Sequence, residues 1–324
     1  MGELIILVVT VFCVTFLALG LHLVLHEVGH LIGGLLSGYD FVFFRIGSYT
    51  LLNDHGHLRF TKFNIPGTAG QCIMKPPHFD QFKYRLYFSG GILVNGMLAL
   101  IGIFLCFCPI DSIRLFGIEL VYMGIVFLLM NGLPLKMSGI VNDGYHIFKI
   151  KEHEVIKLYN QLMIGVLDIE GYTFSEMDAS LFVCDMNNTS HFYDAYLILM
   201  NAMLLVEKQD YEAAREIFIR VIDDPHCIDL FKNAAKIMMV LLLFIEEGKD
   251  SSIEQYVDKK MMKVIKLQKF DLSSLLCHYC ILVKEGNNKA IEVEKQFLKQ
   301  KDNVLEQGEV SLFMDLYDKI KKHI

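Results

Sequence analysis

Long apolar runs, interrupted by few polar residues, dominate the first 150 positions of the chain. About 20 residues of α-helix, each rising 1.5 Å, are enough to cross a hydrocarbon core of ~30 Å. Three runs reach this length and predict membrane-spanning helices at about residues 4–25, 86–108 and 115–133. A cleaved signal peptide is the weaker interpretation of the first run, because no Lys or Arg precedes it and no small-x-small site ends it.

The loop between the first two spans, residues 39–85, has the composition of β-strands. Apolar, aromatic and β-branched side chains fill residues 41–44, 49–52 and 58–63, and residues 53–56 form an Asn-Asp-His-Gly turn. Such a turn between two apolar runs is typical of a β-hairpin. We therefore expect a hairpin at the inner face of the membrane, with an edge strand able to pair with an extended peptide.

Helical hairpins are expected from about residue 151 onward. The clearest pair lies at residues 194–223, where apolar residues recur at helical spacing and Asp210 opens the second helix. Weaker pairs are residues 233–247 with 251–267, and 271–284 with 288–301. The spacing resembles a tetratricopeptide repeat, in which small residues let paired helices approach closely. Residues 151–324 are therefore predicted to form an all-α, helical-hairpin solenoid of this type.

Composition separates the two halves of the chain. Hydrophobic residues make up 53%, charged residues only 21%, and the mean hydropathy is +0.40, values that exclude a disordered chain and favour a membrane protein. Residues 1–150 hold nine Lys or Arg and eight Asp or Glu, and the other residues hold 21 and 29, so the negative charge belongs to the second half. That sign gives no reason to expect nucleic acid as a partner.

The eight cysteines are scattered, and several lie within apolar runs. This is the pattern of reduced, buried thiols and not of a disulfide framework. Cys277 and Cys280 form a lone C-x-x-C on a predicted helix, which we interpret as core packing or chance in preference to a metal site.

Basic residues near the span ends predict the orientation of the chain. Six of them lie in the loop between the first two spans: Arg45, Arg59, Lys62, Lys75, Lys83 and Arg85. The amino terminus has none before the first span, and the short connection between the second and third spans has one. By the positive-inside rule the loop and everything after the third span are cytoplasmic, and the amino terminus lies outside.

Residues 26–30 read His-Glu-Val-Gly-His, the H-E-x-x-H pattern, at the end of the first predicted span. Two histidines at i and i+4 lie about 40° apart around an α-helix, so both imidazoles can reach one zinc ion. Glu27 lies beside them, placed to take a proton from metal-activated water. Snorkelling of these groups to the membrane interface is the alternative, although ionisable groups in a span usually face a protein interior and carry function.

A catalytic zinc site needs a third protein ligand. Asp143, which follows the third span, is the carboxylate that we predict for this role, although an Asn-Asp-Gly sequence taken alone is typical of a simple turn. His22 lies one further turn back on the helix face of His26. We expect His22 to be a hydrogen-bonded structural histidine, with support of a metal ligand as the alternative.

Over about residues 3–150 the chain resembles the site-2 protease family of intramembrane zinc metalloproteases, peptidase family M50. The resemblance rests on the H-E-x-x-H of the first span, on a G-x-x-N element in the second, and on N-x-x-P followed by Asp-Gly after the third. Here Asn95 follows Gly91 with one extra residue between them, and Asn131 opens Asn-Gly-Leu-Pro. Three departures are a long interval from Asn131 to Asp143, Asn142 in place of the usual Leu, and Ile92 in place of a common Pro.

The resemblance implies an α-helical membrane protein whose three-span metalloprotease core carries a β-hairpin between spans 1 and 2. It implies that His26, His30 and Asp143 ligate Zn²⁺ and that Glu27 is the general base. It also implies that Asn95 and Asn131 hold substrate or the developing oxyanion. Residues 70–77 are similar to a loop of small bacterial members, which places the chain in a bacterial cell membrane.

Two functions of different classes follow from these expectations. The first is a zinc-dependent intramembrane endopeptidase (domain 1–150) whose substrate is a membrane-spanning or membrane-associated peptide or protein. Its cytoplasmic helical repeats (domain 151–324) would recruit substrate or a regulatory protein. The second is a catalytically silent membrane scaffold whose repeats bind peptides. A complete H-E-x-x-H favours the enzyme, because a scaffold has no need of Glu27.

Overall fold

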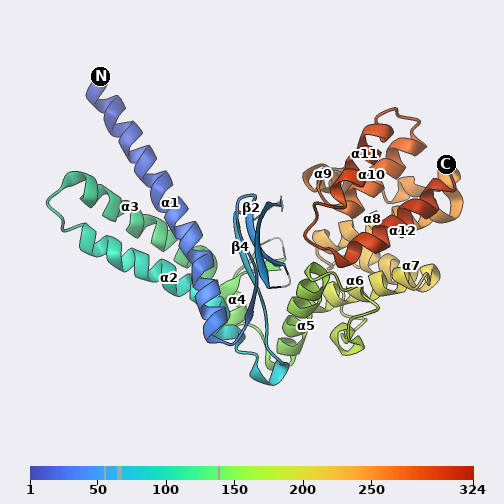
Figure 1. Ribbon diagram of the computed structural model, residues 1–324, viewed down its shortest axis with the longest axis horizontal. Coiled ribbons are helices and arrows are strands. Elements are labelled where there is room, and N and C mark those ends of the chain that lie inside the picture. Colours follow the sequence, from blue (N-terminus) through green and yellow to red (C-terminus); the bar gives the residue numbers. More distant parts are fainter. Residues whose placement is uncertain (55, 64–67, 138) are drawn as a thin grey trace. The chain divides into compact units, whose positions relative to one another are not determined.

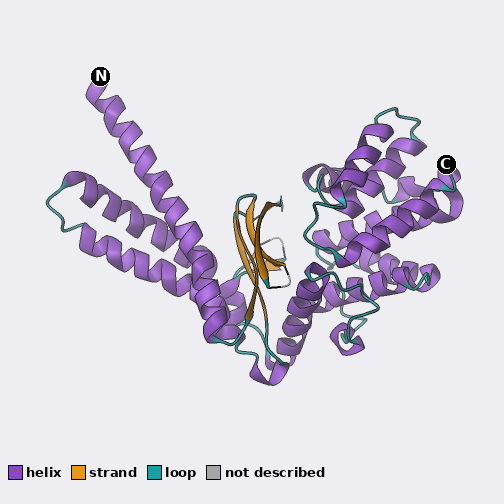
Figure 2. Ribbon diagram, in the orientation of Figure 1, coloured by secondary structure: helices purple, strands orange, loops and turns teal. Residues whose placement is uncertain are grey.

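The computed structural model describes residues 1–54, 56–63, 68–137 and 139–324. The chain is mostly helical and includes a small four-stranded sheet (Figures 1 and 2). It divides into two compact units, the first made of Met1–Lys62 and Thr68–Glu152 and the second containing His153–Ile324. The division falls close to residue 150, where the change in composition lies.

The first unit contains three long helices, α1 (Gly2–Leu36), α2 (Tyr84–Leu105) and α3 (Asp111–Phe127). A π-helical turn, η2 (Leu128–Gly132), continues α3. Among the described residues, these three helices are long and apolar enough to cross a membrane. Helix α1 extends well past residue 25, and it ends where Gly38 adopts a left-handed φ of 79° and the Tyr39 amide bonds back to the Gly34 carbonyl.

The amino-terminal part of α1 presents apolar side chains outward. More than half of the surface of each of these side chains is exposed: Leu4, Ile5, Ile6, Leu7, Val8, Val9, Phe12, Phe16 and Leu17. A continuous apolar surface of this kind is unfavourable in water and favourable in lipid. The exposed apolar side chains therefore agree with the composition in favouring a membrane environment for this helix.

The loop between α1 and α2 folds into an antiparallel sheet in the order β3-β2-β1-β4. Its strands are β1 (Asp40–Ile46), β2 (Tyr49–Asp54), β3 (His57–Lys62) and β4 (Gly70–Lys75). Strands β1 to β3 occupy the segments that the sequence predicts, although His55 of the predicted turn lies outside the described residues. Strand β4 occupies residues 70–75 of the segment expected to be a loop at residues 70–77. Its burial alternates, with Cys72 and Met74 buried, and it pairs with β1 at the edge of the sheet.

Shorter elements complete the first unit. A 3₁₀ turn, η1 (Phe79–Gln81), precedes α2. After η2 the chain forms a two-stranded hairpin, β5 (Lys136–Met137) with β6 (Ile140–Val141), and then helix α4 (Asp143–Phe148). The small hairpin occupies the long interval between Asn131 and Asp143 noted in the sequence.

Glycines let the three long helices touch backbone to backbone. A Cβ placed on Gly29 of α1 would lie 2.3 Å from the carbonyl oxygen of Gly90 on α2, and one on Gly90 would lie 2.0 Å from that of Gly29. On α2 and α3, a Cβ on Gly102 or on Gly117 would lie 2.7 Å from the carbonyl oxygen of the other. Small residues at such crossings allow the close van der Waals packing that holds helices together without a hydrophobic driving force.

Helices are the regular elements of the second unit among its described residues. Its α-helices are α5 (Glu152–Ile169), α6 (Phe192–Glu207), α7 (Tyr211–Asp223), α8 (Asp229–Glu247), α9 (Lys259–Leu267), α10 (Leu272–Lys284), α11 (Ala290–Gln300) and α12 (Gly308–Lys321). Three 3₁₀ turns, η3 (Ala179–Phe182), η4 (Gly248–Asp250) and η5 (Ile253–Gln255), lie between them. Helix α8 is buried along residues 237–245 and forms the centre of the core.

Two of the predicted helix pairs are present, as α6 with α7 and as α10 with α11. The helix predicted at 251–267 was too long, because Asp258 caps a helix that begins only at Lys259 and accepts a hydrogen bond from the Met261 amide. Cys277 and Cys280 are fully buried free thiols in the core. A tetratricopeptide-like arrangement of these helices stays a prediction.

The backbone contact between α1 and α2 gives a first prediction. We expect Gly29→Ala to lower the thermal unfolding temperature, because the helices must separate, with a cost of about 1–3 kcal/mol. Gly20→Ala in the same helix is the matched control, since a Cβ there meets no atom within 4 Å. Circular dichroism of both variants in detergent measures the effect. Equal unfolding temperatures for the two variants would show that the contact is not needed.

Candidate metal centre

Helix α1 carries His26, Glu27 and His30 near its carboxyl end. Their exposed fractions are 6%, 8% and 6%, so all three are buried although the first half of the same helix is exposed. The i, i+4 spacing brings the two imidazoles together one turn apart, edge to face, with ring centroids 4.7 Å from each other. The helix therefore presents two metal-binding side chains to the interior of the first unit.

Asp143 comes to the same place as the first residue of α4. The residue before it, Asn142, joins four backbone groups around the chain reversal that follows the third long helix. Its side chain donates to the carbonyl oxygens of Met130 (2.6 Å) and Leu133 (2.7 Å) and accepts from the amides of Leu135 (3.1 Å) and Tyr145 (3.0 Å). Gly144 follows Asp143, and a Cβ on it would lie 2.4 Å from the Gly132 carbonyl oxygen. Residue 144 must therefore be glycine for α4 to pack against Gly132.

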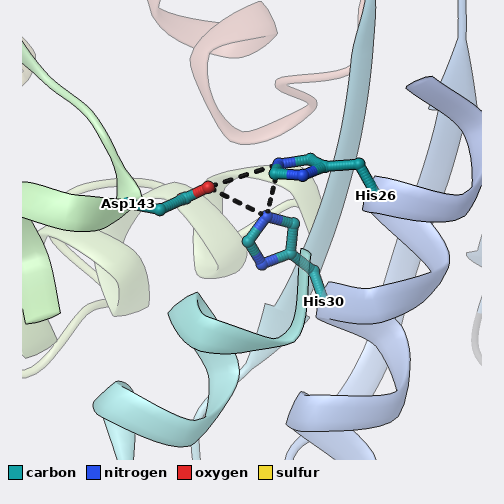
Figure 3. Close-up of side chains that lie close together, drawn as sticks. All are labelled: His26, His30 and Asp143. Atoms are coloured by element: carbon teal, nitrogen blue, oxygen red, sulfur yellow. Dashed lines mark hydrogen bonds and ion pairs between the residues drawn. The ribbon is translucent and has the colours of Figure 1, made fainter. Parts of the chain in front are cut away.

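His26, His30 and Asp143 converge on one point (Figure 3). The two Nε2 atoms are 3.1 Å apart, and each lies 3.3 Å from Oδ2 of Asp143. Ligands bound tetrahedrally to zinc at about 2.0–2.1 Å are separated by about 3.3 Å from one another. Among the described residues, this is the group of His, Cys, Asp and Glu side chains whose spacing suits a metal ion. The donor atoms therefore fit zinc in chemistry and in spacing.

Electrostatics favours a charged Asp143 and a neutral Cys72 at this place. Burial alone would raise the pKa of Asp143, but the charge of His30 and hydrogen bonds with His26 and His30 outweigh it and hold the pKa below its usual range. In β4, burial, with the charge of Glu27 adding to it, raises the pKa of the Cys72 thiol to about 12. Cys72 is therefore a thiol at neutral pH, whereas Asp143 is a carboxylate ready to bind a cation.

Glu27 lies against strand β4. A Cβ placed on Gly70 would be 2.9 Å from both Cγ and Oε1 of Glu27, so a side chain at this position would displace the carboxylate. The backbone amide of Cys72 donates a hydrogen bond to the Glu27 carboxylate. The charges of His30, His26 and Asp143 also act on this carboxylate. A carboxylate beside the metal ligands is placed to act as a base on water bound between them.

Tyr87 on α2 orients His30. The backbone carbonyl oxygen of Tyr87 lies 3.0 Å from His30 Nδ1, and since a carbonyl only accepts, Nδ1 must carry the proton. In the neutral form of His30, Nε2 then has the lone pair that can bind a metal. The Tyr87 hydroxyl donates to the Cys72 carbonyl at 2.6 Å, which ties β4 to α2 beside the site.

The two asparagines named by the family resemblance differ in their surroundings. Asn95 is fully buried, and its amide lies between His26 and His22, which is also fully buried. Asn131 is half-buried, and no hydrogen bond joins its side chain to a described residue. The structure therefore brings Asn95, but not Asn131, within hydrogen-bond distance of His22 and His26.

Sequence reasoning missed Asn142 and Tyr87. Asn is a favoured residue directly before a helix, so Asn142 could have indicated a helix that begins at Asp143. Tyr87 gave no such signal, because its contribution to His30 comes from a backbone carbonyl, which every residue has.

No protein-family model, curated protein or solved structure matches the chain.

The triad predicts a single zinc site. We expect one zinc per chain, and we expect Asp143→Ala to weaken zinc binding by more than about 100-fold, beyond the 10–100-fold typical of groups that only support a ligand. Asp111→Ala is the control, because that side chain is 87% exposed at the start of α3. Competition with a fluorescent zinc chelator measures both affinities. Unchanged affinity in Asp143→Ala would remove Asp143 from the site.

Proposed function

We propose that the chain is a zinc-dependent intramembrane endopeptidase of the site-2 protease type. The observation that carries this proposal is the convergence of His26, His30 and Asp143 at tetrahedral spacing. Glu27 adjoins them at the end of a helix that is apolar and exposed over its first half. A structural zinc site would complete its coordination with a fourth protein ligand, whereas three ligands leave a position for water.

The residues of the site divide the work of peptide hydrolysis between them. A bound zinc ion would supply Lewis-acid activation of water and of the scissile carbonyl. Glu27 would take the proton of the attacking water and hand it to the leaving amine. Burial of Glu27, His26 and His30 keeps bulk water away from these groups, which strengthens the electrostatic interactions between them.

A membrane-spanning substrate would have to unwind before cleavage, because its backbone carbonyls are already hydrogen-bonded within its helix. An unwound segment can add as a strand to a sheet edge. Strand β4 is the edge beside Glu27, whereas β3, the other edge, is separated from it by β2 and β1. We therefore assign the capture of substrate to the β4 edge.

Cross-linking tests this assignment. A photoreactive residue next to the cleavage site of a substrate is expected to label β4, at Gly70 or Gln71, in preference to β3. The inactive Glu27→Gln variant is suited to this experiment because it would retain bound substrate. Labelling confined to His57–Lys62 would transfer the capture to β3.

The orientation follows from the basic loop between the first two long helices. With that loop inside, the amino terminus of the protein lies outside a bacterial cell membrane and the second unit lies in the cytoplasm. In that position the helical unit would recruit substrate or a regulatory protein. Both assignments belong to the proposal.

A catalytically silent scaffold is the competing function, and Glu27→Gln separates the two. For a protease we expect zinc content to stay at one per chain while turnover falls about 100- to 10,000-fold, the usual contribution of a general base. Glu3→Gln, an exposed residue at the amino terminus, is the control. Mass spectrometry of membrane peptides from cells with each variant gives the measurement. A scaffold would keep its cellular role with Glu27→Gln, and that result would overturn the proposal.

A further inference from the structure

Three buried polar groups lie in line behind His26. Nε2 of His22 is 3.0 Å from the backbone carbonyl oxygen of Leu120 on α3, and Nδ1 of His22 is 2.9 Å from Oδ1 of Asn95. Nδ2 of the same amide is 2.8 Å from Nδ1 of His26. His22 and Asn95 are both fully buried, so water does not compete for these hydrogen bonds.

The carbonyl of Leu120 sets the direction of the whole chain of hydrogen bonds. A carbonyl oxygen only accepts, so Nε2 of His22 must carry a proton and donate it. A neutral His22 then has a lone pair on Nδ1, which can accept only from the Nδ2 group of Asn95. This pairing requires the amide to be turned by half a rotation from its placement, so that Oδ1 faces His26 and accepts from Nδ1–H.

The opposite direction would need a cationic His22. With Oδ1 facing His22, as the side chain is placed, both nitrogens of that ring would have to donate, and no carboxylate pairs with His22 among the described residues. An unpaired buried cation costs several kcal/mol. Turning an amide by half a rotation exchanges its two ends with almost no change of shape. The direction of hydrogen bonds in which His22 is neutral is therefore favoured.

This direction matters for metal binding, because it decides which nitrogen of His26 has the lone pair. With the proton on Nδ1, the lone pair lies on Nε2, which is the atom 3.3 Å from Oδ2 of Asp143. His30 reaches the same state through the Tyr87 carbonyl. Two imidazole lone pairs and a carboxylate then converge as three acceptors, an arrangement that a divalent cation stabilises.

We infer that His22 and Asn95 are positioning residues that hold His26 in its metal-binding tautomer, and that Asn95 does not contact substrate. The inference rests on the proposed zinc site. Two glycines make room for the chain of hydrogen bonds. A Cβ on Gly91 would lie 2.5 Å from Cε1 of His26, and a Cβ on Gly124 would lie 3.2 Å from Cε1 of His22.

Zinc affinity of the full-length chain in detergent tests the inference without an activity assay. Asn95→Leu removes the acceptor for His26 Nδ1–H at similar volume, and we expect zinc binding to weaken about 10- to 100-fold. Asn95→Asp keeps an acceptor and is expected to stay within about threefold of the native affinity, as carboxylates commonly orient zinc-bound histidines. Asn131→Leu is the matched control, with the native affinity expected.

A double variant distinguishes positioning from packing. Because His22 acts on His26 only through Asn95, His22→Phe added to Asn95→Leu should weaken zinc binding no further. The absorption band of bound Co²⁺ should shift in Asn95→Leu and match the native band in Asn95→Asp. If Asn95→Leu does not fold, His22→Phe alone reports on the same chain of bonds, and a several-fold loss of affinity is expected.

The outcomes separate this inference from the proposed function. Native zinc affinity in both Asn95→Leu and His22→Phe, with reduced turnover, would overturn the inference alone. Asn95 would then be assigned to substrate binding. Absence of zinc binding in the native chain would overturn the proposed function together with the inference.

Discussion

The backbone contact of α1 with α2 at Gly29 and Gly90 is the constraint on which the metal centre depends. Only when these helices touch can the Tyr87 carbonyl reach His30 and the Asn95 amide reach His26. A side chain at either glycine would separate the helices and carry both partners out of hydrogen-bond range. The glycine between the two histidines of the H-E-x-x-H segment is therefore as necessary to the site as the histidines.

The second constraint is the cost of an unsatisfied polar group in an apolar surrounding, about 1–3 kcal/mol for each buried donor or acceptor. Three long apolar helices offer few partners, so each histidine nitrogen that faces away from the metal-binding point is paired with a specific group. The chain from Leu120 through His22 and Asn95 ends at His26, and Tyr87 serves His30. The outer end of each line of hydrogen bonds is a carbonyl oxygen, which only accepts. The lone pairs of His26 and His30 therefore lie on the Nε2 atoms that face Asp143.

The route of the chain after α3 explains the long interval from Asn131 to Asp143 and the role of Asn142. The long interval from Asn131 to Asp143 holds the β5–β6 hairpin, which returns the chain to the level of the histidines. Asn142 then holds the backbone of that reversal with four hydrogen bonds.

The sequence by itself determined the apolar spans, the first three strands, the helical second half and the pairing of His26 with His30, because these depend on periodicity within one element. It named Asp143 from its place after the third span and from a resemblance, and it interpreted strand β4 as a loop; the hydrogen bond of Asn95 to His26 it did not indicate. Those features depend on which elements meet, and neighbours more than 60 residues apart along the chain, such as His26 and Asn95, leave no local period. Tertiary structure alone decided them, because hydrogen-bond direction is set by the partner and not by the residue itself.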